Sequence, residues 1–210
     1  MLGTRPDIAF AVTKLSQFAA NPSNDHLTKA LYICHYLVGT SDYKIVYRQQ
    51  AFNGEGLYTE ADSDWASDST TRCSTTGYLV HLAGAVFSWN SRAQKTVVLS
   101  STEAEYMSLS DASRQLVWIN SLLGEIGMDL TPIPLAGDNQ GAIFMASNPV
   151  QERRIKHIDI RYHFIHQVIR DEQVILLFLE GSENPADMLT KNLGHIKFLK
   201  HRSRLGLEFK

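Results

Sequence analysis

Residues 83–84, an Ala-Gly pair, divide two strand-like runs at 77–82 and 85–89 and limit how the chain can fold. A connector of two residues joins antiparallel neighbours, so these runs predict a β-hairpin. The other strand-like runs are residues 57–62, 133–136 and 173–179. Helical patterns separate the last two, and a helical crossover makes the strand after it parallel to the strand before it. The sequence therefore predicts an α/β fold whose five-stranded mixed sheet has three antiparallel strands, then two parallel ones, with flanking helices.

Apolar residues at helical spacing predict the helices around this sheet. Residues 5–39 contain two such patterns, interrupted at Asn21-Pro22, and predict an αα-hairpin before the sheet, followed by a short strand at 44–48. The second helix of the hairpin has the apolar stripe Leu27, Leu31, Cys34 and Leu37. A long helix is predicted from Ser101 to about Leu123. Its buried stripe is expected to be Leu109, Ala112, Leu116, Ile119 and Leu123. Shorter helices are predicted at 140–147, at 158–170 and from 185.

Acidic residues recur where the predicted strands end or helices begin. Asp62 and Asp64 lie at the end of the first strand-like run, and because side chains alternate along a strand they point to the same face. Asp138 follows the run at 133–136, at the rim where ligands bind in open α/β sheets. The other members of this set are Glu103, Glu105 and Asp187. Such hard oxygen ligands suit a divalent cation, although an isolated Asp-x-Asp pair is more often a solvated turn.

Composition excludes several classes of protein. The net charge of −2 argues against a generic phosphate binder, although a local basic face remains compatible with it. The two cysteines, Cys34 and Cys73, form no CxxC pair, so neither a disulfide framework nor a zinc site is expected and a reducing compartment fits best. No apolar run approaches about 18 residues, so no membrane partner is expected.

Several longer sequence strings resemble one known family. They are Thr4-Arg5-Pro6-Asp7-Ile8-Ala9-Phe10-Ala11-Val12, Asp62-Ser63-Asp64-Trp65-Ala66, Ser74-Thr75-Thr76-Gly77-Tyr78, Leu99-Ser100-Ser101-Thr102-Glu103-Ala104-Glu105-Tyr106, Asp138-Asn139-Gln140, Lys156-His157-Ile158-Asp159-Ile160-Arg161-Tyr162-His163-Phe164 and Ala186-Asp187. In this order they resemble the C-terminal part of copia-class (pseudovirus) LTR retrotransposon Pol polyproteins, the end of the reverse transcriptase and the ribonuclease H domain. The strings span nearly the whole chain, so the resemblance is far more specific than any single acidic motif.

The resemblance implies a ribonuclease H-like fold in three parts. Residues 1–50 would be a remnant of the reverse transcriptase thumb and connection, residues 51–192 the ribonuclease H domain, and residues 193–210 a basic C-terminal tail. No Tyr-x-Asp-Asp sequence is present, so no polymerase activity is expected of this chain. The implied partners are an RNA–DNA hybrid and the remainder of the reverse transcriptase in the parent polyprotein. The implied location is the cytoplasm, within a virus-like particle of the parent element, or the nucleus.

The resemblance also implies an endonuclease that hydrolyses the RNA strand of RNA–DNA hybrids. Its catalytic residues and metal ligands would be Asp62, Glu105, Asp138 and Asp187. Glu103 is the alternative to Glu105 and is otherwise a helix cap, and Asp64 is a possible auxiliary ligand. The cofactor would be two Mg²⁺ ions, with Mn²⁺ able to substitute, and ions about 3.5–4 Å apart can hold both the attacking water and the leaving oxygen.

Substrate contacts are expected from amide and basic residues. Asn139 and Gln140 could reach sugars and base edges in the shallow minor groove, or could be a helix cap and a solvated amide. Phosphate contacts, or alternatively a plain solvated face, are assigned to Arg72, Arg153, Arg154, Lys156 and Arg161.

Two histidines are auxiliary candidates. Related ribonucleases H often carry a product-releasing histidine before the last aspartate, and residues 180–184 contain none. His157 or His163 could take that role, whereas a zinc site is disfavoured because no cysteine lies nearby. The competing interpretation of the whole chain is a catalytically silent nucleic-acid-binding or assembly remnant of a retrotransposon polyprotein.

Overall fold

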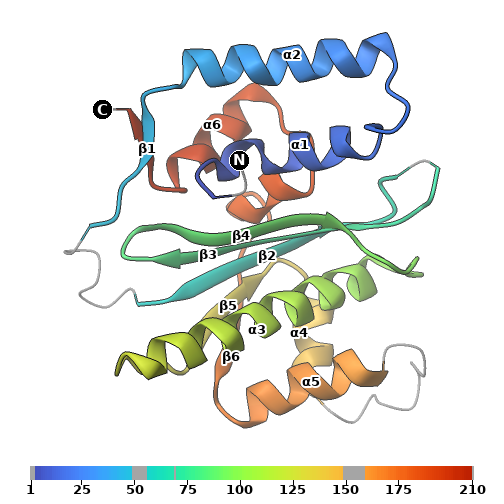
Figure 1. Cartoon of the computed structure of the whole chain (residues 1–210). Helices are drawn as coiled ribbons and strands as arrows, with labels where there is room; N and C mark the ends of the chain where they lie inside the picture. The colour runs from blue at the N-terminus through green and yellow to red at the C-terminus, as the bar shows by residue number, and fades with distance from the viewer. Residues whose placement is uncertain (1–2, 49–55, 69, 149–158, 210) are drawn as a thin grey trace.

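The computed structural model describes residues 3–48, 56–68, 70–148 and 159–209, with side chains described from residue 163 onward in the last range. Its centre is a five-stranded sheet in the order β4-β3-β2-β5-β6 (Figure 1). The strands are β2 (Tyr58–Asp64), β3 (Thr75–Leu82), β4 (Ala85–Ala93), β5 (Ile133–Gly137) and β6 (Val174–Phe178). β2, β3 and β4 pair antiparallel, whereas β5 pairs parallel with both β2 and β6. The predicted mixed sheet is therefore confirmed.

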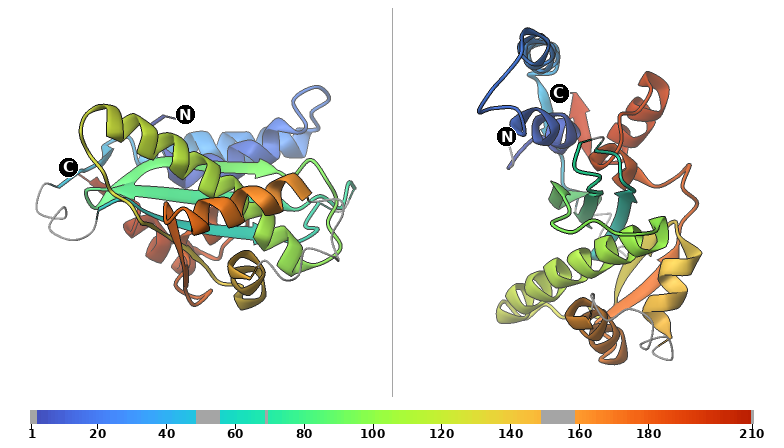
Figure 2. Two further views of the ribbon diagram at one scale, coloured as in Figure 1. Left: turned by 90° about the horizontal axis from the view of Figure 1, so that it is seen from below. Right: turned by 90° about the vertical axis from the view of Figure 1, so that its right-hand side faces the viewer.

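Helices α3 (Ser101–Glu125), α4 (Gln140–Ser147) and α5 (Asp159–Arg170) cover one face of this sheet (Figures 1 and 2). The α3 helix begins where the Ser100 side chain accepts a hydrogen bond from the backbone N–H of Glu103. All five residues of its predicted stripe are buried: Leu109, Ala112, Leu116, Ile119 and Leu123. They pack with Leu57, Val80 and Leu135 in the main hydrophobic core.

The opposite side of β3 and β4 carries elements from both ends of the sequence (Figure 2). The N-terminal elements are the 3₁₀ helix η1 (Pro6–Ile8), α1 (Ala9–Ser16), α2 (Asn24–Gly39) and β1 (Tyr43–Ile45). The C-terminal elements are the 3₁₀ helix η4 (Pro185–Leu189), α6 (His195–Ser203) and β7 (Leu207–Phe209). β1 and β7 form a separate antiparallel pair. A second apolar cluster that includes Ala9, Leu79 and Leu205 joins the two ends to the sheet.

This second layer refines two sequence-based expectations. The αα-hairpin is present as α1 and α2, but no residue of α2 is buried, and Leu27 and Leu31 of its apolar stripe are 59% and 50% exposed. Residues 193–209, expected to be a basic tail, contain α6 and β7. The proposed division at residues 50 and 192 stays a prediction. No helix within the described part of the chain is long and apolar enough to cross a bilayer.

Candidate metal centre

Asp62 lies near the end of β2, the central strand of the sheet, and its side chain is fully buried. Its backbone is held in place by the Ser108 hydroxyl of α3, which donates to the Asp62 carbonyl at 2.7 Å. Asp64 follows two residues later as the last residue of β2 and is half-buried. Asp62 is thus built into the core of the sheet, whereas Asp64 lies at its margin.

Asp138 directly follows β5, which runs parallel to β2. Because parallel strands end at the same edge of a sheet, this connectivity brings Asp138 toward the end of β2. The loop after β6 passes very close: a Cβ added at Gly181 would lie 2.8 Å from the Asp138 carboxylate. A side chain at position 181 would therefore displace the Asp138 carboxylate from this position.

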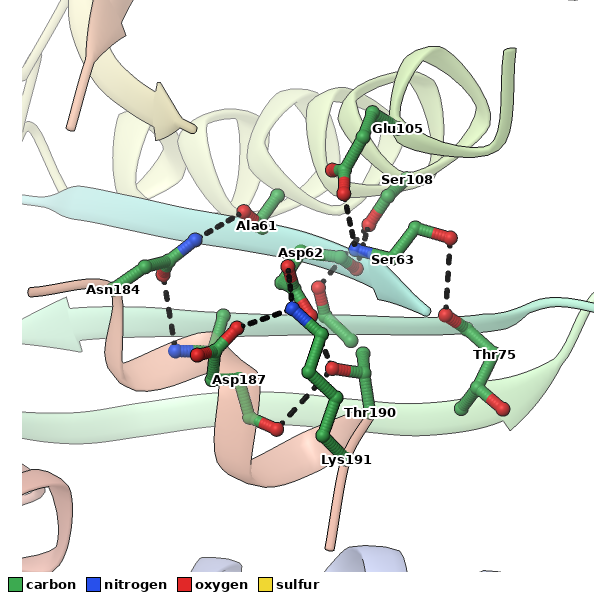
Figure 3. Close-up of polar contacts among 12 residues, drawn as sticks. Ala61, Asp62, Ser63, Thr75, Glu105, Ser108, Asn184, Asp187, Thr190 and Lys191 are labelled. Carbon is green, nitrogen blue, oxygen red and sulfur yellow. Dashed lines mark hydrogen bonds and ion pairs between the residues drawn. The ribbon is translucent and has the colours of Figure 1, made fainter. Parts of the chain in front are cut away.

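Asp187 reaches the same place from η4, which packs against β2 and β3. Asn184 fixes the start of η4, because its side chain accepts from Ala186 N at 3.1 Å and donates to the Ala61 carbonyl of β2 at 2.9 Å (Figure 3). Gly77, the partner of Asp62 on β3, leaves room for this approach, since a Cβ there would lie 2.7 Å from both Leu189 Cβ and Thr190 Cγ2.

The three aspartates converge: Asp62, Asp138 and Asp187 each offer a carboxylate oxygen, and these oxygens lie within 4.8 Å of one another. They come from β2, from the end of β5 and from η4, so only the folded chain brings them together. Three buried or half-buried hard oxygen donors, with no cysteine or histidine among them, fit a Mg²⁺ or Mn²⁺ ion.

Glu105 borders this cluster from the second turn of α3. Its Oε1 accepts a hydrogen bond at 3.1 Å from the backbone N–H of Ser63, next to Asp62 (Figure 3). It is not one of the three residues whose oxygens lie within 4.8 Å of each other. Glu103 instead accepts from the Leu99 N–H at 2.8 Å and closes the start of α3. Of the two glutamates, Glu105 is thus the one that faces Asp62.

Two lysines neutralise the cluster. The Nζ atom of Lys191 lies 2.6 Å from Asp187 Oδ1 and 3.1 Å from Asp62 Oδ1, bridging the two carboxylates (Figure 3). Lys197 of α6 donates to Asp187 Oδ2, and the Thr190 hydroxyl donates to Asp62 Oδ2. Each oxygen of Asp62 and Asp187 therefore has a donor on it.

Burial and mutual repulsion govern the protonation of these acids. Burial raises the pKa of Asp62 to about 6, against the opposing attraction of Lys191. Burial and the charges of Asp62 and Asp138 raise the pKa of Glu105 well above its usual range, and burial also raises the pKa of Asp138. At Asp187 the hydrogen bonds from the two lysines outweigh burial, and the pKa is lowered. Asp187 is thus the most firmly ionised of the four.

The other predicted site residues are not members of the acidic cluster. Asn139 is the N-cap of α4, its side chain accepting from Ala142 N at 2.9 Å, and Gln140 beside it is exposed. Arg72 is exposed in the loop after β2, and His163 is exposed on α5. Outside the described residues lie Arg153, Arg154, Lys156 and His157, and the side chain of Arg161 is not described. Their assigned roles stay predictions.

Sequence reasoning missed Asn184, Thr190 and Lys191. The signal available for Lys191 was its position four residues after Asp187 in a predicted helix start, a spacing at which opposite charges pair. Asn184 stands directly before Pro185, as a capping residue does. Nothing in the sequence pattern pointed to the contact between Thr190 and Asp62.

Comparison with solved structures supports the fold class. LC11-RNase H1, isolated from compost, superposes with a TM-score of 0.50 at 14% identity, covering 65% of this chain and 93% of that one. The described chain is therefore a ribonuclease H-like α/β domain whose sheet edge carries an acidic cluster. None of the protein-family profiles compared with the sequence matches it.

Sequence relatives identify the family. The chain is 41% identical over 205 residues to the retrovirus-related Pol polyprotein from transposon RE1 of Arabidopsis thaliana, and 38% identical over 209 residues to that from transposon TNT 1-94 of Nicotiana tabacum. These matches cover 97% and 99% of this chain but only 14% and 15% of the relatives. The chain belongs to the family of retrovirus-related Pol polyproteins of transposons and corresponds to one segment of them.

Proposed function

We propose that this chain is a metal-dependent endonuclease that hydrolyses the RNA strand of RNA–DNA hybrids during retrotransposon reverse transcription. The observation that carries the proposal is the convergence of Asp62, Asp138 and Asp187 from three separate elements, with carboxylate oxygens within 4.8 Å. The ribonuclease H-like fold and the Pol relatives support the same reaction class. The proposed partners are the hybrid and the remainder of the reverse transcriptase.

In this proposal the three aspartates would hold two divalent ions, with Asp62, on the central strand of the sheet, as their shared ligand. When bound, Mg²⁺ ions would polarise the phosphoryl group and lower the pKa of an attacking water molecule. Asp138 and Asp187 would supply the other carboxylate ligands. Glu105, whose pKa burial raises, can hold a proton at the border of the cluster more readily than an exposed glutamate.

Substrate binding is assigned to groups around the same edge. The oxygen of Asn139 is occupied by its own helix cap, so its amide N–H groups and the exposed Gln140 side chain can contact sugars. Lys197 and Lys200 on α6 place positive charge beside Asp187 and Glu183 and could bind the phosphate backbone.

The test is cleavage of an end-labelled RNA–DNA hybrid with Mg²⁺ or Mn²⁺. Asp62→Asn removes the central carboxylate and should lower the cleavage rate by about a hundredfold or more, since losing a few kcal/mol of transition-state stabilisation has that effect. Asp171→Asn is the matched control, because Asp171 is exposed and precedes β6, at the end of the sheet opposite the cluster.

The same cleavage experiment distinguishes the nuclease from one alternative function. The two lysines already neutralise Asp62 and Asp187, an arrangement that also suits a catalytically silent nucleic-acid-binding or assembly module. Equal products from wild type and Asp62→Asn would refute the nuclease assignment. Retention of the hybrid without cleavage would favour the silent module.

A further inference from the structure

The ammonium group of Lys191 lies where a cation would bridge Asp62 and Asp187. Its Nζ is 3.1 Å and 2.6 Å from one oxygen of each carboxylate, distances typical of ammonium hydrogen bonds. Mg²⁺ binds oxygen at about 2.0–2.1 Å, so an ion and this ammonium cannot occupy the bridging position together.

The remaining oxygens of the two carboxylates are also engaged. Thr190 donates to the second oxygen of Asp62, and Lys197 donates to the second oxygen of Asp187. Each carboxylate oxygen has a second lone pair and can still coordinate an ion beside Thr190 or Lys197, but an ion that takes the position between the two carboxylates must displace Lys191. Lys191 is the donor that contacts both acids, whereas Lys197 contacts Asp187 alone among the three clustered aspartates.

The Lys191 side chain can leave without moving the backbone. It is 38% exposed, so a path to solvent exists. The backbone N–H of Lys191 donates to the Asp187 carbonyl at 2.9 Å, which anchors the base of the side chain while its four-carbon stem can rotate. The ammonium group is thus tethered to the site but not locked in it.

We propose that Lys191 is a displaceable internal counter-ion: it neutralises the Asp62–Asp187 pair when no metal is bound, and it moves to solvent when a divalent cation enters. This rests on the proposed function only in assuming that the cluster binds metal. The displacement lowers the apparent metal affinity of the wild type, because only the fraction of molecules with the ammonium removed can bind.

The direct test measures the accessibility of Lys191 in the wild-type protein. The full chain is treated with an amine-acetylating reagent under two conditions, one containing EDTA and the other saturating Mg²⁺ or Mn²⁺. The modification of each lysine is followed by mass spectrometry. The modification rate of Lys191 should rise several-fold with metal, whereas that of Lys29, paired with exposed Asp25 on α2, should not change. An unchanged or reduced rate at Lys191 under saturating metal would overturn the proposal.

Calorimetric titration of the lysine variants with Mg²⁺ or Mn²⁺ provides the second measurement. Lys191→Met should bind the ion about tenfold more tightly than wild type, a difference of about 1.4 kcal/mol, and Lys197→Met should show a smaller gain. Lys29→Met removes the same charge on α2, where its partner is exposed Asp25, and should leave the affinity nearly unchanged. Equal affinities of wild type and Lys191→Met would contradict the proposal.

The acetylation and calorimetry results are interpreted together. If Lys191 acted only through its charge, Lys191→Met would bind the ion more tightly, but acetylation of Lys191 in the wild type would not increase with metal. That combination of results would contradict displacement. Should Lys191→Met fail to fold by circular dichroism, Lys191→Gln and the wild-type acetylation carry the test. If metal raised the acetylation rate of Lys191 but the protein did not cleave the hybrid, the nuclease assignment would be refuted and the displacement of Lys191 would stand. If the protein cleaved the hybrid but metal did not raise that rate, the nuclease assignment would stand and the displacement would be refuted.

Discussion

At the scale of single residues, the site stores electrostatic energy that a cation can release. The side chain of Asp62 is fully buried and lies close to the carboxylates of Asp138 and Asp187. Lys191 is the lysine that pairs with it. The pKa of Asp62 is raised to about 6 from 3.8, so folding makes the protonated form easier to populate than it is in the unfolded chain. Ionising it at neutral pH costs folding free energy, and part of the metal's binding energy would offset that cost.

The sign of this effect predicts a pH dependence. Because the folded-state pKa is raised, Asp62 costs nothing well below pH 3.8, and the cost develops as pH rises from about 3.8 to about 6. In EDTA, Asp62→Asn should therefore gain stability relative to wild type across this window, by on the order of 2 kcal/mol. Urea unfolding at several pH values measures the difference.

That difference isolates Asp62 from other groups. Burial lowers the pKa of His201, which destabilises the protein as pH falls below about 6.5, but His201 is present in both proteins. Saturating Mg²⁺ should reverse the order of the two stabilities at neutral pH, since the ion binds the ionised wild-type site more tightly. Stability curves that run parallel from pH 4 to pH 8 would show that Asp62 titrates normally.

At the scale of elements, the site depends on how closely η4 approaches β3. The contact is possible because Gly77 has no side chain: the nearest atoms to an added Cβ are Leu189 Cβ and Thr190 Cγ2, both at 2.7 Å. η4 carries Asp187, and β3 pairs Gly77 with Asp62 on β2. The distance between the carboxylates of Asp62 and Asp187 therefore depends on Gly77, which lies on β3.

Gly77→Ala should push η4 away from the sheet. We expect a loss of about 1–3 kcal/mol from overpacking and at least a tenfold weaker Mg²⁺ affinity, measured by urea unfolding and calorimetry. The control is Gly124→Ala in α3, where an added Cβ has no neighbour within 4 Å and should stabilise the helix by about 0.5–1 kcal/mol. Wild-type metal affinity in Gly77→Ala would mean that η4 is not held by this contact.

Comparison of these elements with the sequence shows what local patterns can predict. The acids were predictable because each stands at the end of a recognisable strand or the start of a helix. Lys191 and Asn184 were harder to assign, since their partners, Asp62 and Ala61, are 129 and 123 residues away. The short strand predicted at 44–48 overlaps β1, but β7 and its pairing with β1 were missed because three residues are too few to show alternation. The stripe on α2 is amphipathic, but amphipathicity alone does not reveal what covers it.

At the scale of the whole molecule, residues 3–48 and residues 193–209 form one layer. Asp7 accepts hydrogen bonds from Arg5 at 2.9 Å and from the Tyr36 hydroxyl at 2.6 Å, and Arg202 of α6 donates to Tyr36 at 3.1 Å. The same helix α6 carries Lys197 to Asp187. The N-terminal helices thus support the element that reaches the acidic cluster.

Removing Asp7 should destabilise the entire protein. Asp7→Ala leaves the mostly buried Arg5 guanidinium without its carboxylate, which should cost about 3 kcal/mol. The matched control, Asp25→Ala, removes an exposed partner of Lys29 and should leave the unfolding transition nearly unchanged. Urea unfolding followed by both fluorescence and circular dichroism should show one shifted transition. Two separate transitions would indicate that the N-terminal layer unfolds independently.

The long separation between Asp62 and the segment holding Asp187 and Lys191 also has a consequence during synthesis. Asp62 leaves the ribosome 129 residues before Lys191. At typical elongation rates this interval is on the order of ten seconds. Throughout it, the growing polypeptide has its central carboxylate but neither the last aspartate nor the lysine that neutralises it. A nascent chain of this sequence therefore cannot assemble its complete set of acids until η4 has emerged.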